Sequence, residues 1–233
     1  MNPSLVPIQR FWVFAGEINV DFQKVIAVAT RRGIFQPAFE AYGGLAGFID
    51  YGPVGVRMRR RILEVWRKHY VIDAGCLELD GSLIGPETLF QASGHLGEFD
   101  DALIDCKNCG KQFRADHLVK NGEEMSREEL SDAVLGTACP GCGDELSEMS
   151  AFNLMFSTGV GAGKGSPGYL RPETAQSIFL AFPWLLRQNR GKLPFAGAQI
   201  GRSFRNEISP RQGPLRMREF TQMEVEHFFL PND

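Results

Sequence analysis

Arginine, glutamate and phenylalanine residues recur two positions apart near the C-terminal end of the sequence. Arg205 and Glu207 lie on one segment, and Arg216, Arg218 and Phe220 lie on the next. Proline and glycine between the two segments predict an antiparallel hairpin. Because side chains alternate across a strand, these groups are expected to share one face. Guanidinium, carboxylate and phenyl groups together suit a ligand with phosphates, a base edge and a ring, as in ATP.

Several elements are expected to position this hairpin. Residues 24–32 predict a short helix that ends at Gly33, and residues 175–190 predict a helix that ends before Gly191. Residues 71–84 predict strand-like segments. A longer helix is predicted from Pro53 to about residue 70, with an apolar stripe made by Met58, Ile62, Val65, Trp66 and His69. The stripe alone favours a surface helix packed on its own sheet, whereas the arginines beside it could face RNA.

Four cysteines form two Cys-x-x-Cys pairs separated by 29 residues, in a segment that also holds a polar helical stretch at residues 126–134. Tetrahedral zinc takes four thiolates at about 2.3 Å, and each pair presents two of them. The pattern predicts a structural zinc site with the ligands Cys106, Cys109, Cys139 and Cys142. The alternative is a pair of disulfides, which a reducing cytosol disfavours. Cys76 lies in an apolar segment and is expected to be an inert core thiol.

The glycine-rich stretch at residues 159–168 resembles a phosphate-binding loop only superficially. Around Lys164 the required first glycine is Thr158, and the required Ser/Thr is Gly165. Pro167 and Pro172 also oppose the helix that should follow. We therefore expect a flexible connection.

Bulk properties are those of an ordinary globular chain of 233 residues, with 43% hydrophobic and 23% charged residues. A net charge of −3 argues against a dedicated basic DNA-binding module, but it allows local contacts with RNA. No apolar run approaches the roughly 20 residues that span a bilayer. The apolar run at residues 11–16 is too short for a signal peptide, so a cytoplasmic location is expected.

Four blocks of sequence carry a resemblance to a known family. Phe204-Arg-Asn-Glu207 resembles motif 2 of class II aminoacyl-tRNA synthetases, and the string through residue 226 is similar to archaeal and eukaryotic glycyl-tRNA synthetases. The other blocks are residues 42–53, residues 93–95 with 113–117, and residues 171–176. The resemblance runs from about residue 24 to the end. It implies an α+β fold, with an antiparallel sheet flanked by helices and a zinc-ribbon-like insert.

The resemblance also implies a division of the chain. Residues 1–23 are expected to be an extension of unknown role, and residues 24–104 the first part of the catalytic domain. Residues 105–149 would be the zinc-binding insert, and residues 150–233 would continue the catalytic domain through motif 2. Motif 3 and an anticodon-binding domain are not found, so we expect the N-terminal part of a longer synthetase. Residues 52–86 resemble motif 1, which implies a homodimer.

The family pattern assigns roles to residues of this sequence. Arg205 corresponds to the catalytic arginine that binds the α-phosphate and the substrate carboxylate. The implied ATP-binding residues are Arg205, Asn206, Glu207, Leu215, Arg216, Met217, Arg218, Glu219 and Phe220, with Mg²⁺ assisting. The implied glycine-binding residues are Arg114, Glu173, Phe220, Thr221, Gln222, Met223 and Glu224. Asp116 and His117 are given no catalytic role.

The expected function is ATP-dependent ligation of glycine to tRNA(Gly) through a glycyl-adenylate. One alternative is another class II adenylate-forming ligase, which would differ in the amino acid that supports pyrophosphate exchange. A second is a non-catalytic zinc-ribbon module that binds tRNA, which would not bind ATP.

Overall fold

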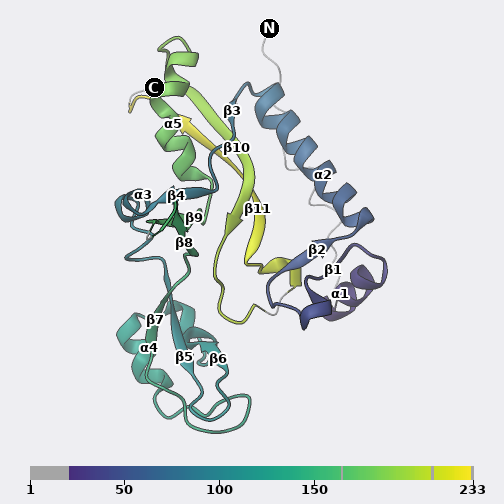
Figure 1. Cartoon of the computed structure of the whole chain (residues 1–233), viewed down its shortest axis with the longest axis vertical. Helices are drawn as coiled ribbons and strands as arrows, with labels where there is room; N and C mark the ends of the chain where they lie inside the picture. Colours follow the sequence, from purple (N-terminus) through teal and green to yellow (C-terminus); the bar gives the residue numbers. More distant parts are fainter. Residues whose placement is uncertain (1–20, 164, 211–212, 232–233) are drawn as a thin grey trace.

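The computed structural model describes residues 21–231, apart from residues 164 and 211–212 (Figure 1). The predicted extension at residues 1–23 lies almost entirely outside this range. The helices are α1 (Phe22–Arg31), α2 (Pro53–Arg67), α3 (Glu87–Ala92), α4 (Arg127–Val134) and α5 (Ala175–Gln188). The strands are β1 (Phe35–Pro37), β2 (Ile49–Tyr51), β3 (Leu77–Leu79), β4 (Ile84–Pro86), β5 (Asp100–Asp105), β6 (Gln112–Arg114), β7 (Ser150–Asn153), β8 (Ser157–Val160), β9 (Ser166–Leu170), β10 (Phe195–Phe204) and β11 (Glu219–Phe228). Within the described residues, no helix has both the length and the hydropathy to cross a membrane.

The long β10–β11 ribbon organises the fold. The two strands pair antiparallel along their whole length, from Phe195 opposite Phe228 to Phe204 opposite Glu219. Strand β3 joins the other edge of β10, but it runs parallel. The expectation of an antiparallel sheet therefore holds for the hairpin and not for this third strand, which reaches β10 after helix α2. Smaller antiparallel sheets order their strands as β4-β9-β8, β6-β5-β7 and β1-β2.

Helices α5 and α2 lie on either side of this ribbon (Figure 1). Ile178 and Leu185 of α5 are buried against Phe195 and Leu79. Beside them the ring of Phe182 stacks on Phe195, and the ring of Phe228 lies tilted against it. On the other side, Trp66 packs against the buried Cys76, Ala196 and Ala198, as expected for a core thiol at Cys76. Most of the predicted stripe on α2 stays uncovered, since Met58, Ile62 and Val65 are 51%, 58% and 56% exposed.

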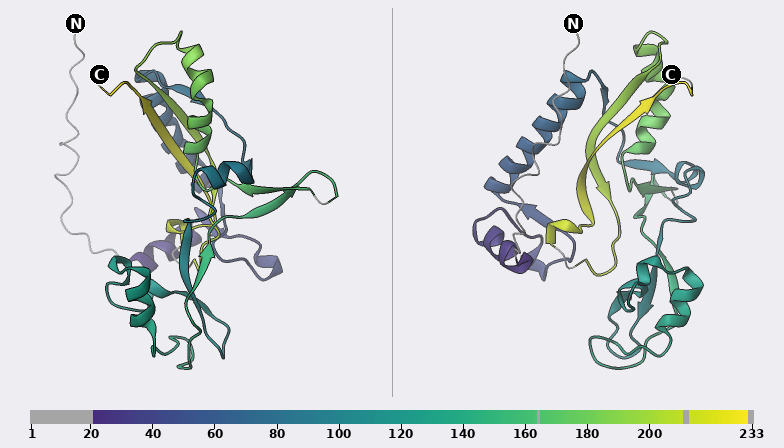
Figure 2. Two further views of the ribbon diagram at one scale, coloured as in Figure 1. Left: turned by 90° about the vertical axis from the view of Figure 1, so that its left-hand side faces the viewer. Right: turned by 180° about the vertical axis from the view of Figure 1, so that it is seen from behind.

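The cysteine-rich module, formed by β5, β6, β7 and α4, has a hydrophobic core of its own. Ile104, Leu130, Val134 and Leu146 form this core together with Cys106 and Cys139. Ser126 caps α4 through a reciprocal capping box with Glu129, which confirms the helix predicted at residues 126–134. The module extends away from the β10–β11 ribbon at the lower end of both views in Figure 2.

The structure corrects three local expectations. The glycine-rich stretch, expected to be a flexible connection, contains paired strands: β8 and β9 form a hairpin that extends from the rest of the chain (Figure 2, left). Helix α2 ends at Arg67, and a π-helical turn continues to Asp73. Strand β10 ends at Phe204, so Glu207 lies beyond the strand and not on the strand face that was expected to carry it. There its N–H donates to the Arg205 carbonyl at 2.7 Å, which turns the chain. The helices predicted before Gly33 and Gly191 are present, and both glycines have a positive φ.

A buried arginine ties the ribbon to the loops beside it. Arg171 is 3% exposed, and it donates to the carbonyls of Arg202 at 2.7 Å and Gly81 at 2.8 Å. The side-chain amide of buried Gln199 is best oriented with its oxygen toward Arg171, where it accepts a hydrogen bond from Arg171 Nη1 at 2.6 Å. Burial lowers the pKa of the Arg171 guanidinium. Gly201 lies directly against Arg171 Nη2, so a Cβ there would overlap the guanidinium.

Replacing Gly201 with alanine is expected to destabilise the chain by about 1–3 kcal/mol, because the guanidinium would have to leave its carbonyl partners. Urea unfolding measures the difference in free energy. Gly159→Ala is the matched control, since a Cβ on that strand glycine meets nothing within 4 Å. Equal stabilities of the two variants would contradict this description of Arg171.

Candidate functional site

Arg205 lies at the junction of several elements. Its guanidinium carbon is 5.4 Å from the ring centres of both Phe99 and Phe220, so the cation lies against two aromatic faces. Its Nε donates to the Pro172 carbonyl at 3.1 Å, and its backbone N–H donates to the Arg218 carbonyl at 3.0 Å. The last bond extends the β10–β11 ladder by one step, which places Arg205 on the same face as Phe220, as the alternation predicts.

Most of the predicted ATP-binding residues surround one cavity of about 500 Å³, a size typical of small-molecule sites. Its lining includes Arg205, Glu207, Leu215, Arg216, Met217 and Phe220, together with Tyr51, Arg59 and Ile62. Arg216 Nε lies 3.6 Å from Glu207 Oε2, and the Glu207 side chain is only 12% exposed. A planar cation, a carboxylate and a ring therefore line one space.

The other predicted ATP-binding residues have different partners. Arg218 donates to the carbonyls of Ala46 and Glu207, both at 2.8 Å, and so joins the segment before β2 to the hairpin. Burial lowers the pKa of this guanidinium. Glu219 pairs with Arg202, and the Asn206 N–H donates to the Leu154 carbonyl at 2.8 Å. A direct nucleotide contact by these three side chains stays a prediction.

Two of the predicted glycine-binding residues, Glu173 and Glu224, both contact residues at the start of α5. Glu224 Oε2 accepts from the backbone N–H of Thr174 at 2.8 Å and also from its hydroxyl, while Gln222 donates to Glu224 Oε1 at 2.8 Å. The N-terminal end of a helix favours a carboxylate, because unpaired N–H groups point outward there. Gln176 donates to Glu173 Oε1 at 2.6 Å. Both carboxylates thus accept hydrogen bonds from neutral donors, and in the part of the chain that the structure describes neither forms an ion pair with a lysine or an arginine.

Several buried polar atoms around these carboxylates have no hydrogen-bond partner among the described residues. They are Arg171 Nη2, Gln176 Oε1, Ser203 Oγ and Gln222 Oε1. Ser203 and Gln222 belong to the face of the ribbon that carries Phe220 and Glu224. Buried polar groups are normally satisfied, so a cluster of unsatisfied ones points to a polar ligand.

Three predicted glycine-binding residues do not join this cluster. Thr221 and Met223 alternate to the opposite face of β11, where Arg59 Nη1 donates to the Thr221 hydroxyl at 3.3 Å. Both residues line the α2 side of the same 500 Å³ cavity that Arg205 and Phe220 line. Arg114 is bound to Asp116 through contacts of 3.0 and 2.5 Å, and it lies 3.3 Å from Asp101. The hydrogen bonds from Arg114 and its charge interaction hold the Asp116 pKa below its usual value despite burial, while burial raises the Asp101 pKa.

The four cysteine sulfurs converge in the cysteine-rich module. Cys106 Sγ lies 3.4 Å from Cys142 Sγ, Cys109 Sγ lies 3.8 Å from Cys139 Sγ, and all four lie within 4.8 Å of one another. Backbone N–H groups of Cys109 and Asn108 point at Cys106 Sγ and lower its pKa to about 6. The cysteines are free thiols and not the alternative pair of disulfides. Their arrangement suits one tetrahedral metal ion.

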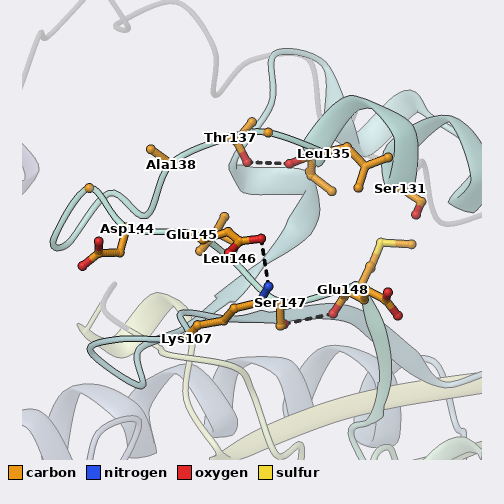
Figure 3. Close-up of a pocket in the computed structure, with 14 residues that line it drawn as sticks. Lys107, Ser131, Leu135, Thr137, Ala138, Asp144, Glu145, Leu146, Ser147 and Glu148 are labelled. Atoms are coloured by element: carbon orange, nitrogen blue, oxygen red, sulfur yellow. Dashed lines mark hydrogen bonds and ion pairs between the residues drawn. The ribbon is translucent and has the colours of Figure 1, made fainter.

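The same module carries a second cavity, of about 690 Å³, between α4 and the second cysteine pair (Figure 3). Several of its polar side chains have partners within the module. Lys107 pairs with Glu145 at 2.9 Å, and the hydroxyls of Thr137 and Ser147 donate to the carbonyls of Val134 and Glu148. Because these groups already have partners, this cavity lacks the unsatisfied polar atoms of the ribbon face.

Other residues of the site were not predicted from the sequence. Thr174 and Gln176 belong to the block at residues 171–176 that carries the resemblance. A helix predicted to start just after Glu173 would have indicated that N–H donors of these two residues are available to a carboxylate. His95 also belongs to such a block, and its Nε2 lies 3.6 Å from Glu173 Oε1. Phe99 and Ser203 carry no sequence signal, because a phenylalanine and a serine at these positions look like ordinary core and strand residues.

The chain is similar to known class II aminoacyl-tRNA synthetases over the segment that carries the β10–β11 ribbon and over most of its length. The model of the tRNA synthetase class II core domain (G, H, P, S and T) matches residues 164–233. The glycine–tRNA ligase of Methanothrix thermoacetophila is 51% identical over 218 residues, which is 91% of this chain and 38% of that protein. The Methanocaldococcus jannaschii glycine–tRNA ligase is 46% identical over 90% of this chain and 38% of that protein.

The chain belongs to the glycine–tRNA ligase family of class II synthetases. It spans 38% of the length of these two ligases. Two solved structures share its fold, each with a TM-score of 0.55. The RNA-binding domain of threonyl-tRNA synthetase from Cryptosporidium parvum is 18% identical over 88% of this chain and 37% of that chain. Prolyl-tRNA synthetase from Giardia lamblia, in complex with prolyl-adenylate, is 16% identical over 89% of this chain and 31% of that chain.

Glu173, Glu224 and Glu226 form an acidic face on this chain, and their mutual repulsion is expected to make its stability depend on pH. Burial raises the pKa of Glu226, and the nearby Glu224 and Glu173 carboxylates raise it further. Because the folded pKa lies above the unfolded value, ionised Glu226 costs stability above that pKa, and the cost vanishes at low pH. Glu226→Gln is therefore expected to raise the melting temperature by roughly 1–2 °C at neutral pH and by less near pH 4.

Thermal unfolding at the two pH values tests this expectation. Glu128→Gln is the control, since Glu128 is an exposed residue on α4. A melting temperature of the Glu226 variant that is unchanged at neutral pH would show that the three carboxylates do not repel one another.

Proposed function

We propose that this chain supplies the amino-acid-activating site of a glycine–tRNA ligase, which joins glycine to ATP as glycyl-adenylate and then transfers glycine to tRNA(Gly). The observation that supports this most directly is the common face of Arg205, Phe220 and Glu224 on the β10–β11 ribbon. The family of the chain and the unpartnered polar atoms around Glu224 support the same function.

In the proposed first step, a carboxylate oxygen of glycine attacks the α-phosphorus of ATP, and the bond to pyrophosphate breaks. Negative charge builds on the α-phosphate oxygens, so a fixed guanidinium lowers the barrier. Arg205 suits this role because two aromatic rings and the Pro172 carbonyl hold it in place. Phe220 offers a ring face for adenine, and Glu207 and Arg216 line the same cavity. Mg²⁺ would neutralise charge on the departing phosphates.

Recognition of glycine rests on its ammonium group and on its size. In the proposed complex, Glu173 and Glu224 bind the ammonium, which supplies the positive charge that these two side chains lack in the free chain. Because every competing amino acid is larger, a closed wall beyond the α-carbon would exclude them all. Recognition of this kind needs no attractive contact with a side chain of the substrate.

Glu224→Gln is expected to lower kcat/KM for glycine by about 10- to 100-fold, the loss that follows removal of one charged hydrogen bond. The fold should survive, because the new amide oxygen can still accept from Thr174 and the Gln222 amide can rotate. Glycine-dependent exchange of pyrophosphate into ATP measures the effect. The assay uses a chimera in which this chain replaces the matching region of the Methanothrix thermoacetophila ligase.

Glu128→Gln, on exposed α4, is the matched control for this substitution. Unchanged exchange in the Glu224 variant would remove that residue from the site. Exchange supported by another amino acid, and not by glycine, would favour a different adenylate-forming ligase. Failure of the chain to bind ATP would favour the tRNA-binding module.

The proposal includes a structural zinc ion in the cysteine-rich module. Tetrahedral Zn–S bonds of about 2.3 Å place neighbouring sulfurs about 3.8 Å apart. The observed separations of 3.4 and 3.8 Å fit this value. Four thiolates leave no open coordination position, so the ion would stabilise the module and take no part in the reaction.

The purified chain is expected to hold about one zinc ion, and Cys139→Ser is expected to lose it. Metal analysis measures the content, and hydrogen exchange of α4 reports the loss of module structure. Cys76→Ser is the matched control, because Cys76 is buried against Trp66, outside the cluster. A chain without zinc that keeps α4 fully protected would contradict a structural role for the metal.

The exposed stripe on α2 supports a homodimer as part of the same proposal. Ile62, Val65, Trp66, Tyr70 and Met223 line an apolar cavity of about 440 Å³ beside that helix. A second copy covering it would bury the stripe, consistent with the motif 1 resemblance of residues 52–86. We place the ligase in the cytoplasm, where tRNA(Gly) and a reducing environment for the thiolates are found.

A further inference from the structure

The Ser93-Gly94-His95 turn follows helix α3 and carries two side chains in contact. Helix α3 ends at Ala92, and Gly94 takes a φ of 79°, which reverses the chain. The turn brings Ser93 Oγ within 2.9 Å of His95 Nδ1. Asn153 fixes the following backbone by donating to the His95 carbonyl at 2.9 Å.

The imidazole of His95 is held on several sides. Its ring contacts Phe90 and Phe99 edge-on, with ring centres 6.2 and 5.3 Å away, and its side chain is 13% exposed. Phe99 is also one of the two rings that flank Arg205. His95 is therefore packed against the same aromatic ring as the proposed catalytic arginine.

Both nitrogens of this imidazole face polar atoms. With Ser93 at Nδ1, the remaining nitrogen Nε2 points at Glu173 Oε1 from 3.6 Å. This distance is longer than a hydrogen bond, but polar contacts at an active site commonly shorten when the substrate binds. Gln176 Nε2 approaches the same oxygen at 2.6 Å. Among the described residues, both polar contacts of the Glu173 carboxylate fall on Oε1, so Oε2 is the oxygen available to a ligand.

We propose that His95 is a positioning residue for amino-acid binding: its Nε2–H, oriented by Ser93, holds Glu173 so that Oε2 is presented to the substrate ammonium. This inference rests on the proposed function. A carboxylate on a flexible side chain loses rotamer freedom when it binds a cation, so holding it in advance strengthens binding.

The test compares three variants in the chimera described above. His95→Phe keeps a ring between Phe90 and Phe99 but removes both nitrogens. It is expected to raise KM for glycine about 10-fold, with KM for ATP and kcat changed by less than about 2-fold. His95→Gln can place an amide N–H near the position of Nε2, and it should recover most of the loss. Ser93→Ala should give a smaller rise, with Ser157→Ala on exposed β8 as its control.

A second measurement on the 233-residue chain does not depend on activity. Nitrogen NMR of the histidine side chains should show His95 protonated at Nε2 and not at Nδ1, and Glu173→Gln should shift its Nε2 resonance. The opposite tautomer, or no response to Glu173→Gln, would overturn the inference. So would equal increases of both KM values in His95→Phe. If the unmodified chimera shows no glycine-dependent exchange, the proposed function fails, and the NMR result still decides whether His95 orients Glu173.

Discussion

The register between β10 and β11 is the constraint on which the site depends. In this register Gln199 lies opposite Glu224 and Ser203 lies opposite Phe220. Because side chains alternate, a slip of one residue would move Phe220 and Glu224 to the face covered by α2. The buried contacts of Phe195 and Phe228 oppose such a slip at one end. At the other end, the Arg205 N–H pairs with the Arg218 carbonyl at 3.0 Å and aligns the two functional segments.

A network of buried polar groups supports this face from beneath. Arg171 joins β10 to the loop at Gly81, and Thr174 joins the start of α5 to Glu224. The chain thus holds a buried cation whose charge acts on Glu224. Glu224 contributes to raising the Arg171 pKa while burial lowers it, so the guanidinium and the acidic face influence each other's charge. A ligand ammonium placed against the carboxylates would complete this arrangement of charges.

Sequence reasoning reached the hairpin, the zinc-type cysteine cluster and most helices, because each depends on local spacing. The shared face of Arg205 and Phe220 followed from strand alternation, whereas Thr221 and Met223 came from the resemblance and lie on the other face. Strand β3 lies within the predicted strand-like segments at residues 71–84, but its parallel pairing with β10 was not predicted, since pairing across distant segments leaves no local pattern. Phe99 and His95 reach the site only through the turn after α3, which no periodicity reveals. Residues 159–168 form a hairpin because the glycines near its turn adopt positive φ.

The central claim is that one face of the ribbon binds an aminoacyl-adenylate, with adenine and ammonium at its two ends. The most direct measurement is NMR mapping of the chain titrated with a non-hydrolysable glycyl-adenylate analogue and, separately, with AMP. The account predicts that both ligands shift resonances around Phe220 and Glu207, and that only the analogue shifts those of Thr174 and Glu224. Shifts confined to the cysteine-rich module, or an identical response to the two ligands, would contradict it.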